Sequence, residues 1–247
     1  MMKRILSFGD SFSDNGFCNG CGYNRLSNGD VWVEHLSGML GATLEDRAWC
    51  GAQSGIGNTS GPADWSGLAW QVETYQPAGS LDDTLCTVLI GINDIYEGEG
   101  SAETVVGNIV SAMEKLVAKG VRNLLVSNVP DITLAPAYVT EYAAKKPAVQ
   151  ALVRDINARL HDALCGESGF ARRHPEVRLY RLDACDVFEG LVRDGRFANV
   201  SEPWNGTYAF PAADGYMWWD SWHPMTATHR VLAEAALRAL KSGPFSD

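Results

Sequence analysis

The stretch LCTVLIGI, residues 85–92, is apolar at almost every position. A β-strand with helices on both of its faces has this pattern, because neither face meets water. A shorter run, KRILSF at residues 3–8, has the same character near the start of the chain. Further strands are expected at residues 42–49, 123–129 and 177–183. These five segments predict a central five-stranded parallel sheet.

Segments with helical periodicity separate the strands. In residues 101–119 the apolar side chains recur every three or four positions, Ser101 can cap the N-terminus and Glu103 lies in the first turn. Further helices are expected at residues 29–40, at residues 148–165 and from Pro224 to about Leu240. Alternation of this kind predicts an α/β protein, a three-layer α/β/α sandwich with helices on both faces of the sheet.

Two long stretches, the Gly-, Ser- and Asn-rich residues 50–67 and the aromatic residues 195–222, are expected to be loops. Loops of this length in a compact domain are usually functional. Ligands of open α/β sheets bind beyond the carboxyl ends of the strands. The end of the first strand is therefore the expected place for chemistry.

The composition is that of a soluble globular protein, with 46% hydrophobic and 20% charged residues among 247. A formal net charge of −10 argues against nucleic acid or an anionic membrane surface as a main partner, because both would repel the chain. No apolar run approaches the roughly 20 residues of an integral membrane segment. The first residues do not match a secretory signal, which predicts either a cytoplasmic protein or a secreted or periplasmic one whose leader was removed. The oligomeric state is left open.

Six cysteines are few for a disulfide scaffold, which a chain of this length does not need. Cys18 and Cys21 have the C-x-x-C spacing of a redox or zinc half-site. A structural zinc site needs a second such pair or a pair of histidines, and the sequence offers neither. We therefore expect no metal and no cofactor, with Cys18 and Cys21 either free or joined in an incidental local disulfide.

The stretch FGDSFSDNG, residues 8–16, places Ser11 directly after the first strand. Ser11 can cap a helix there, since Ser and Asp are favoured at that position. It can also be a nucleophile at a sharp turn. Asp14 and Asn15 are equally good caps, so the local sequence does not decide between the two interpretations.

The histidines discriminate better. His223 lies in YMWWDSWHP, residues 216–224, three residues after Asp220 and directly before the last helix. That spacing lets the Asp220 carboxylate reach the imidazole, fix its tautomer and stabilise its protonated form. The same spacing also occurs in simple turns. The other histidines are expected on the surface or in a loop, namely His35, His161 and His229 within helical patterns and His174 before a proline.

Two strand ends offer hydrogen-bond donors. IGIND, residues 90–94, places Gly91 and Asn93 after the buried strand, and CGAQSG, residues 50–55, places Gly51 after the second. Such donors can stabilise an oxyanion. Asn and Gly at strand ends are also ordinary turn formers.

Taken in order, these blocks resemble the GDSL (SGNH) esterase and lipase family. The matching blocks are Gly9-Asp10-Ser11, Gly51, Gly91 to Asp94, and Asp220 to Pro224. They extend over nearly the whole chain and look most like the branch of plant lipases and bacterial hemolysin- or lecithinase-like enzymes. The resemblance implies a flavodoxin-like SGNH hydrolase fold and one domain over residues 1–247, because the triad draws on both ends of the chain.

The resemblance also implies roles. Ser11 would be the nucleophile, His223 the general base and then the acid, and Asp220 the residue that orients His223. The backbone N–H groups of Ser11 and Gly51 and the side chain of Asn93 would form the oxyanion hole.

Asp10 and Asp94 would be structural under the same resemblance. One departure concerns the second block, which in this branch is usually Asn followed by a Gly-Gly pair. Here it is RAWCGAQSG, in which Gly51 alone occupies the glycine position.

The substrate is less defined. Eight tryptophans, several in the expected loops, can line a site or simply pack the loops. Residues predicted to line the substrate site are Trp65, Trp70, Tyr96 and Trp222. No long apolar lid segment is present, which favours short-chain acyl esters, among them acetylated carbohydrates. The alternatives are a lysophospholipase, phospholipase or acyl-thioesterase with the same triad, and a non-catalytic carbohydrate- or lipid-binding module.

Overall fold

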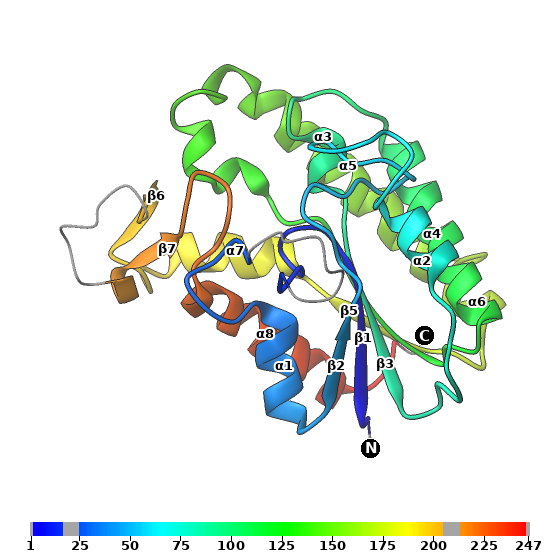
Figure 1. The fold of residues 1–247 in the computed structure, drawn as a ribbon. Coiled ribbons are helices and arrows are strands. Elements are labelled where there is room, and N and C mark those ends of the chain that lie inside the picture. The colour runs from blue at the N-terminus through cyan, green and yellow to red at the C-terminus, as the bar shows by residue number, and fades with distance from the viewer. Residues whose placement is uncertain (1, 17–24, 205–212, 246–247) are drawn as a thin grey trace.

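The computed structural model describes residues 2–16, 25–204 and 213–245, so that Cys18 and Cys21 lie outside the described residues. Its main sheet has five parallel strands in the order β2-β1-β3-β4-β5 (Figure 1). The strands are β1 (Arg4–Gly9), β2 (Thr43–Asp46), β3 (Thr84–Leu89), β4 (Asn123–Ser127) and β5 (Arg178–Leu182). The predicted parallel sheet is confirmed, and its strand order is the flavodoxin-like one.

Helices cover both faces of this sheet, as Figure 1 shows. On one face lie α1 (Trp32–Leu40) and α8 (Thr226–Ser242), and on the other lie α2 (Leu68–Thr74), α4 (Ala102–Ala118) and α5 (Lys146–Cys165). The shorter helices are α3 (Ile92–Ile95), α6 (Phe170–Arg173) and α7 (Ala184–Arg193), with 3-10 turns η1 (Ile132–Leu134), η2 (Pro136–Tyr138), η3 (Ala143–Lys145) and η4 (Ala213–Gly215). The predicted three-layer sandwich is confirmed.

The patterns that predicted these elements have clear physical counterparts. All six residues of β3 are buried, as expected for a strand between two helical layers. The Ser101 side chain accepts a hydrogen bond from the Thr104 N–H at 3.2 Å and so caps α4. The apolar stripe of α4 faces the sheet and is buried. Burial of such stripes against the sheet is the main favourable contribution to this fold.

The prediction of a plain loop over residues 195–222 is wrong for part of that stretch. β6 (Asn199–Pro203) and β7 (Tyr216–Trp218) pair as a small second sheet. β7 has only three residues, too few to show an alternating pattern in the sequence. Because β7 pairs with β6, the chain directly before Asp220 is held in a sheet.

The prediction that His229 lies on the surface is also wrong. His229 is 1% exposed. Its neighbours in sequence are polar, but its position on α8 turns it inward, where its ring contacts the Phe12 ring edge-on at 6.2 Å between centroids. His161 is exposed, and His35 is half-buried with its Nε2 2.9 Å from Thr226 Oγ1.

The strand order places a crevice between β1 and β3. From β1 the chain crosses to β2 on one side and then returns to β3 on the other. At such a switch point the loops beyond the carboxyl ends diverge and leave room for a ligand. Ser11 follows β1 and Asn93 follows β3, so both predicted residues lie at this crevice.

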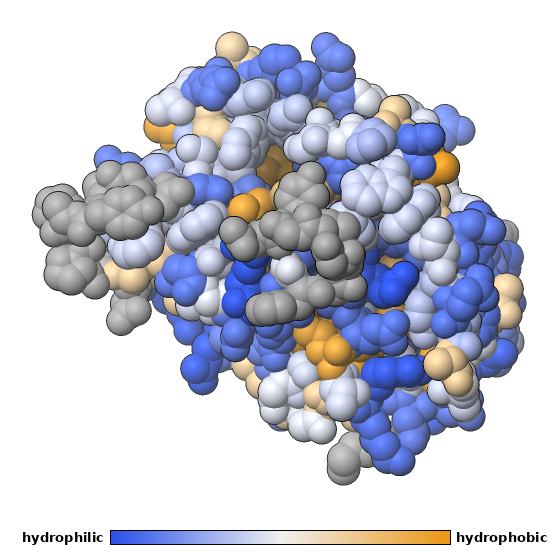
Figure 2. Space-filling model, viewed as in Figure 1, coloured by the Kyte–Doolittle hydropathy of each residue, from blue (hydrophilic) through white to orange (hydrophobic). Residues whose placement is uncertain are grey.

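No helix among the described residues is long and apolar enough to cross a membrane. The face of the molecule in Figure 2 is mostly hydrophilic, with apolar residues in small groups.

Candidate active site

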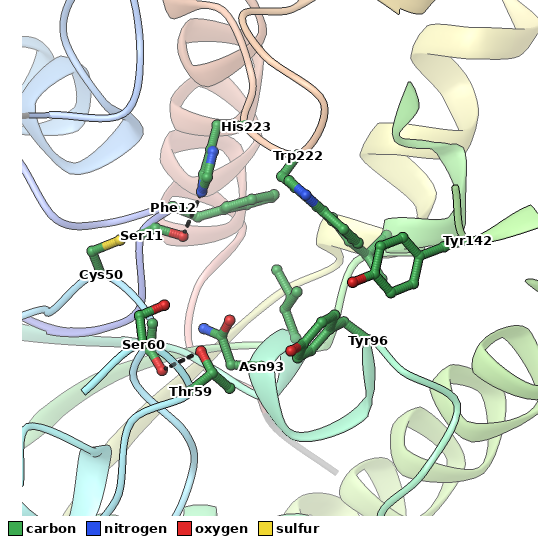
Figure 3. A pocket seen from close by; sticks show the side chains of 13 residues that line it. Ser11, Phe12, Cys50, Thr59, Ser60, Asn93, Tyr96, Tyr142, Trp222 and His223 are labelled. Carbon is green, nitrogen blue, oxygen red and sulfur yellow. Dashed lines mark hydrogen bonds between the residues drawn. The ribbon is translucent and has the colours of Figure 1, made fainter. Parts of the chain in front are cut away.

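A tight turn after β1 holds Ser11. The Asp10 carbonyl accepts the N–H groups of Ser13 and Asp14, both at 3.0 Å. Asp10 Oδ1 accepts the Phe12 N–H, also at 3.0 Å, and the Asp10 side chain is completely buried. With Asp10 buried under the turn, the Ser11 hydroxyl is directed toward the cavity (Figure 3).

The chain can enter this turn only because residue 9 is glycine. A Cβ on Gly9 would lie 2.3 Å from the Leu89 carbonyl oxygen of the neighbouring strand. The buried amide of Gln71 on α2 then holds Gly9 from both sides. Gln71 Oε1 accepts the Gly9 N–H at 3.0 Å, and Gln71 Nε2 donates to the Gly9 carbonyl at 2.8 Å. Gln71 was not predicted from the sequence, in which it is marked only as one amide within an otherwise largely apolar helix face.

Ser11, His223 and Asp220 form a continuous hydrogen-bonded series. His223 Nε2 is 3.1 Å from Ser11 Oγ (Figure 3). His223 Nδ1 is 2.7 Å from Asp220 Oδ2 and 2.9 Å from Asp220 Oδ1. These are hydrogen-bond distances, and they join residues that are 212 positions apart in the chain. The three predicted residues are therefore brought together in the order that a nucleophile, a base and an orienting carboxylate require.

The loop that carries Asp220 and His223 is closed by its own hydrogen bonds. Asp220 Oδ1 accepts the N–H groups of Trp222 and His223 at 2.7 and 2.6 Å. The Trp219 N–H donates to the His223 carbonyl at 2.8 Å. The position of Asp220 relative to His223 is thus set within one turn of chain, which is why a spacing of three residues was informative.

On the opposite side of Ser11 lie the predicted oxyanion donors. Gly51 has a φ of 77°, and a Cβ there would lie 2.3 Å from Asn58 Oδ1, so that only glycine fits. Asn93 Nδ2 donates to the Ala52 carbonyl at 3.0 Å. That bond uses one of the two amide hydrogens of Asn93 and fixes the direction of the other. Gly51 and Asn93 both line the cavity with Ser11.

Asp94 lies behind this side of the cavity. Its carboxylate accepts the Ser54 N–H at 2.9 Å and the Ser54 hydroxyl at 2.6 Å. Asn108 Nδ2 on α4 donates to the same hydroxyl at 3.1 Å. These contacts tie the loop after β2 to the chain after β3 and so hold Gly51 close to Asn93.

A cavity of about 210 Å³ lies over these groups (Figure 3). Tyr96 and Trp222, two of the four residues predicted to line a substrate site, are on its wall. The lining residues that the sequence analysis did not name are Phe12, Cys50, Thr59, Ser60, Ile92, Ile132 and Tyr142.

The structure differs from the sequence analysis at Trp65 and Trp70, which do not line this cavity. They pack with Trp49 as a group of three rings, at 4.5 Å between Trp49 and Trp65 and 5.8 Å between Trp65 and Trp70. Trp49 is buried. Trp65 and Trp70 therefore pack the loop after β2. Loop packing was the alternative to lining a site that the sequence left open for the tryptophans.

Burial and hydrogen bonds set the charge of the carboxyl groups. Burial acts to raise the pKa of Asp220, but hydrogen bonds from His223 and from two backbone N–H groups hold that pKa below its ordinary value. Burial raises the pKa of Asp10 to about 7 and that of Asp46 to about 8. Burial also raises the pKa of the Cys50 thiol to about 12, so that Cys50 remains a neutral thiol beside Ser11.

Within residues 2–16, 25–204 and 213–245, no group of three or more His, Cys, Asp or Glu side chains is placed to hold a metal ion. The C-x-x-C pair Cys18 and Cys21 lies outside those ranges. In the described part of the chain, Cys50, Cys86, Cys165 and Cys185 are not in disulfides.

Comparisons with known proteins show the family of this chain. The family model GDSL-like Lipase/Acylhydrolase matches residues 5–236. The chain is 24% identical to a thermolabile hemolysin of Vibrio parahaemolyticus over 96% of its own length and 64% of that protein, so that it spans less than two thirds of this relative. It is 23% identical to a phosphatidylcholine-sterol acyltransferase of Aeromonas hydrophila, over 97% of its own length and 90% of that protein.

A similar fold occurs in the crystal structure of a member of the lipolytic G-D-S-L family from Veillonella parvula. The TM-score is 0.59 at 16% identity, over 97% of this chain and 98% of the other. The family match covers nearly the whole chain and includes Ser11, Asp220 and His223. The chain therefore belongs to the GDSL-like lipase and acylhydrolase family.

Proposed function

We propose that this protein hydrolyses short-chain carboxylic esters through an acyl-serine intermediate on Ser11. The observation that carries the proposal is the row of contacts from Ser11 Oγ to His223 Nε2 at 3.1 Å and from His223 Nδ1 to Asp220 at 2.7 Å. A row of this kind, open to a cavity at the switch point of the sheet, has the geometry for nucleophilic catalysis.

In the first step, Ser11 Oγ forms a bond to the carbonyl carbon of the ester while its proton passes to His223 Nε2. The tetrahedral intermediate collapses, the bond to the alcohol oxygen breaks, and the alcohol leaves with that proton. A water molecule then attacks the acyl-serine and gives one proton to His223 Nε2. Ser11 recovers this proton as the carboxylic acid is released.

Two groups of residues support the charged states along this path. Asp220 stays ionised, because its pKa lies below the ordinary value, and so stabilises the protonated imidazole of His223. The negative carbonyl oxygen is received by the N–H groups of Ser11 and Gly51 and by the free amide hydrogen of Asn93. Removal of one such donor typically lowers kcat by about 100- to 1,000-fold.

The size of the cavity supports a short acyl chain. Sites for drug-sized ligands usually enclose about 300–1,000 Å³, and this cavity encloses about 210 Å³. Acetyl esters of hydrophilic alcohols, such as acetylated carbohydrates, fit this size. We also propose that residues 1–247 act as one hydrolase domain, since the proposed site draws on the chain from residue 11 to residue 223.

A second candidate is an acyl ester of a lipid. One relative is a hemolysin and another is a phosphatidylcholine-sterol acyltransferase, and the second of these acts on a phospholipid by its printed name. The aromatic residues Tyr96, Tyr142 and Trp222 on the cavity wall suit an apolar chain. Under this alternative the preferred acyl chain would be long.

The test measures hydrolysis of p-nitrophenyl esters from acetate to palmitate by the wild type and by Ser11→Ala. We expect activity on the short esters and a loss of several orders of magnitude in kcat/KM for Ser11→Ala, with an unchanged thermal unfolding curve. Ser111→Ala is the matched control, because it removes an exposed serine hydroxyl on α4 that does not line the cavity, and it should keep wild-type activity. A Ser11→Ala variant with wild-type activity would exclude the acyl-serine mechanism. An optimum at long chains would favour the lipid candidate.

A further inference from the structure

The cavity has two unlike sides, with Ser11 and His223 between them (Figure 3). One side is aromatic and consists of Tyr96, Tyr142 and Trp222. We call this set the apolar wall. The other side consists of Cys50, Thr59, Ser60 and Asn93. We call this set the polar wall.

The apolar wall is held in place by ring contacts. Trp222 lies among three tyrosines, with ring centroids 5.0 Å from Tyr142, 5.5 Å from Tyr138 and 5.7 Å from Tyr96, each nearly edge-on. The hydroxyl of buried Tyr138 donates to the Tyr96 carbonyl. Edge-on aromatic pairs contribute about 0.5–1.5 kcal/mol each beyond the area that they bury. The apolar wall is thus a preorganised surface.

This wall also joins segments that are distant in the sequence. The Ala137 N–H, in η2, donates to the Ser221 carbonyl at 3.0 Å, in the loop of Asp220 and His223. Tyr142 follows η2 in the same stretch of 3-10 turns. The stretch therefore lies against the loop of the base and directs the ring of Tyr142 toward the cavity (Figure 3).

The polar wall is open to solvent at its Thr59 and Ser60 end, while Cys50 and Asn93 are half-buried. Thr59 and Ser60 are both exposed, whereas all three residues of the apolar wall are half-buried. An alcohol part that carries hydroxyl groups loses less hydration on the open side. An acyl chain is removed from water most completely on the aromatic side. Each Å² of apolar surface buried there contributes about 25 cal/mol of binding free energy.

We propose that the apolar wall binds the acyl chain of the ester and that Tyr142 sets the longest chain accepted. In Figure 3, Trp222 lies between His223 and Tyr142, so that Tyr142 is at the end of the apolar wall. A chain that extends from the carbonyl at Ser11 along this wall meets the Tyr142 ring. The proposal rests on the function proposed above and adds the direction in which the acyl chain lies.

The experiment compares two ester series. In the acyl series, p-nitrophenyl esters from acetate to decanoate share one alcohol. In the alcohol series, acetate esters from ethyl to octyl share one acyl group and are followed by acid release. Because one methylene in an apolar pocket changes kcat/KM by about tenfold or more, Tyr142→Ala should raise the octanoate-to-acetate ratio at least tenfold. The ratios in the alcohol series should stay within about twofold of wild type.

Three further variants complete the design. Tyr142→Phe keeps the ring and should keep the wild-type acyl profile. Tyr142→Leu shortens the side chain but still packs on Trp222, so it should move the profile in the same direction if Tyr142→Ala does not fold. Ser60→Ala, on the polar wall, should change the alcohol series more than the acyl series.

A Tyr142→Ala or Tyr142→Leu variant that folds and shows an unchanged acyl profile would overturn the proposal. A change confined to the alcohol series would do the same, because it would place the alcohol on the apolar wall. Failure of the proposed function looks different: the wild type would hydrolyse no ester of either series, or Ser11→Ala would retain wild-type rates.

Discussion

Two carboxyl groups adjoin the nucleophile and the base of the proposed triad. Asp10, next to Ser11 in the chain, is completely buried, whereas Asp220, in contact with His223, is half-buried with its side chain 21% exposed. Asp220 accepts two backbone N–H groups and lies 2.7 Å from His223 Nδ1. Asp10 accepts the Phe12 N–H through Oδ1, while its Oδ2 is buried without a hydrogen-bond partner among the described residues. The two groups thus differ both in the depth of burial and in the number of donors.

Together these two differences give the two groups opposite charge preferences. Burial acts to raise both pKa values, but at Asp220 the imidazole and two N–H groups outweigh it and the pKa lies below the ordinary value. At Asp10, burial prevails over the Phe12 N–H, and the pKa rises to about 7. A carboxylate that must stay charged to orient a base needs several donors, whereas one that closes a turn does not.

The largest effect expected from this comparison is on catalysis. Asp220→Asn should lower kcat/KM by about 10⁴-fold, because an amide neither holds the required tautomer of His223 nor stabilises its protonated form. Asp10→Asn keeps the oxygen that accepts the Phe12 N–H and should stay within about tenfold of wild type. Steady-state hydrolysis of p-nitrophenyl acetate measures both, with unfolding curves as the control for folding. Equal losses in the two variants would contradict the assignment of different roles.

Local signals in the sequence marked the residues of this comparison as candidates, and the resemblance to the GDSL family assigned their roles. Asp220 and His223 lie within one turn of chain, and Ser11 and Asn93 each follow a strand that its apolar pattern reveals. Parallel strands bring their carboxyl ends to one edge, so these positions were expected to meet. The turn at Gly9-Asp10-Ser11 could be predicted for the same reason.

Other features depend on packing between distant segments and left little trace in the sequence. The contacts of Gln71 with Gly9 connect residues 62 positions apart. Tyr142 reaches the cavity from a stretch of 3-10 turns that has no clear period. His229 has polar neighbours in sequence, and only the packing of α8 against the Phe12 turn makes it a core residue. Trp65 and Trp70 lie in the expected loop but turn toward Trp49.

A smaller effect concerns Asp10 and the pH dependence of the free energy of unfolding. The pKa of Asp10 is about 7 in the folded protein and near its ordinary value of 3.8 when unfolded. The stability that this group contributes is therefore complete below pH 3.8 and is lost as the pH rises through 7. Asp10→Asn cannot titrate, so its free energy of unfolding relative to wild type should rise by on the order of 3 kcal/mol from pH 5 to pH 8.

Urea unfolding of wild type and Asp10→Asn at each pH measures this difference. Asp83→Asn is the control, because Asp83 is an exposed aspartate paired with Lys3 and should show no such rise. Parallel pH profiles for wild type and Asp10→Asn would mean that Asp10 is ionised in the folded protein at pH 5.

The smallest expected effect has the opposite sign and concerns the buried base behind the same turn. Burial, and then repulsion between protonated His229 and its neighbours His35, His223 and Arg25, lower the pKa of His229 from 6.5 to about 3. Neither ring nitrogen has a hydrogen-bond partner among the described residues. The unfolded chain takes up a proton below pH 6.5 while the folded one does not, so stability falls as the pH is lowered from 6.5 toward 3.

His229→Leu removes this titration and keeps an apolar side chain against Phe12. Its stability relative to wild type should rise by on the order of 2 kcal/mol between pH 6.5 and pH 5, measured by urea unfolding. His161→Leu, on the exposed face of α5, is the control and should leave the profile parallel to that of wild type. If His229→Leu also runs parallel, folded His229 takes up a proton as the unfolded chain does. Its imidazolium then donates to a hydrogen-bond acceptor, and a charged residue rather than a neutral one lies behind the Phe12 turn.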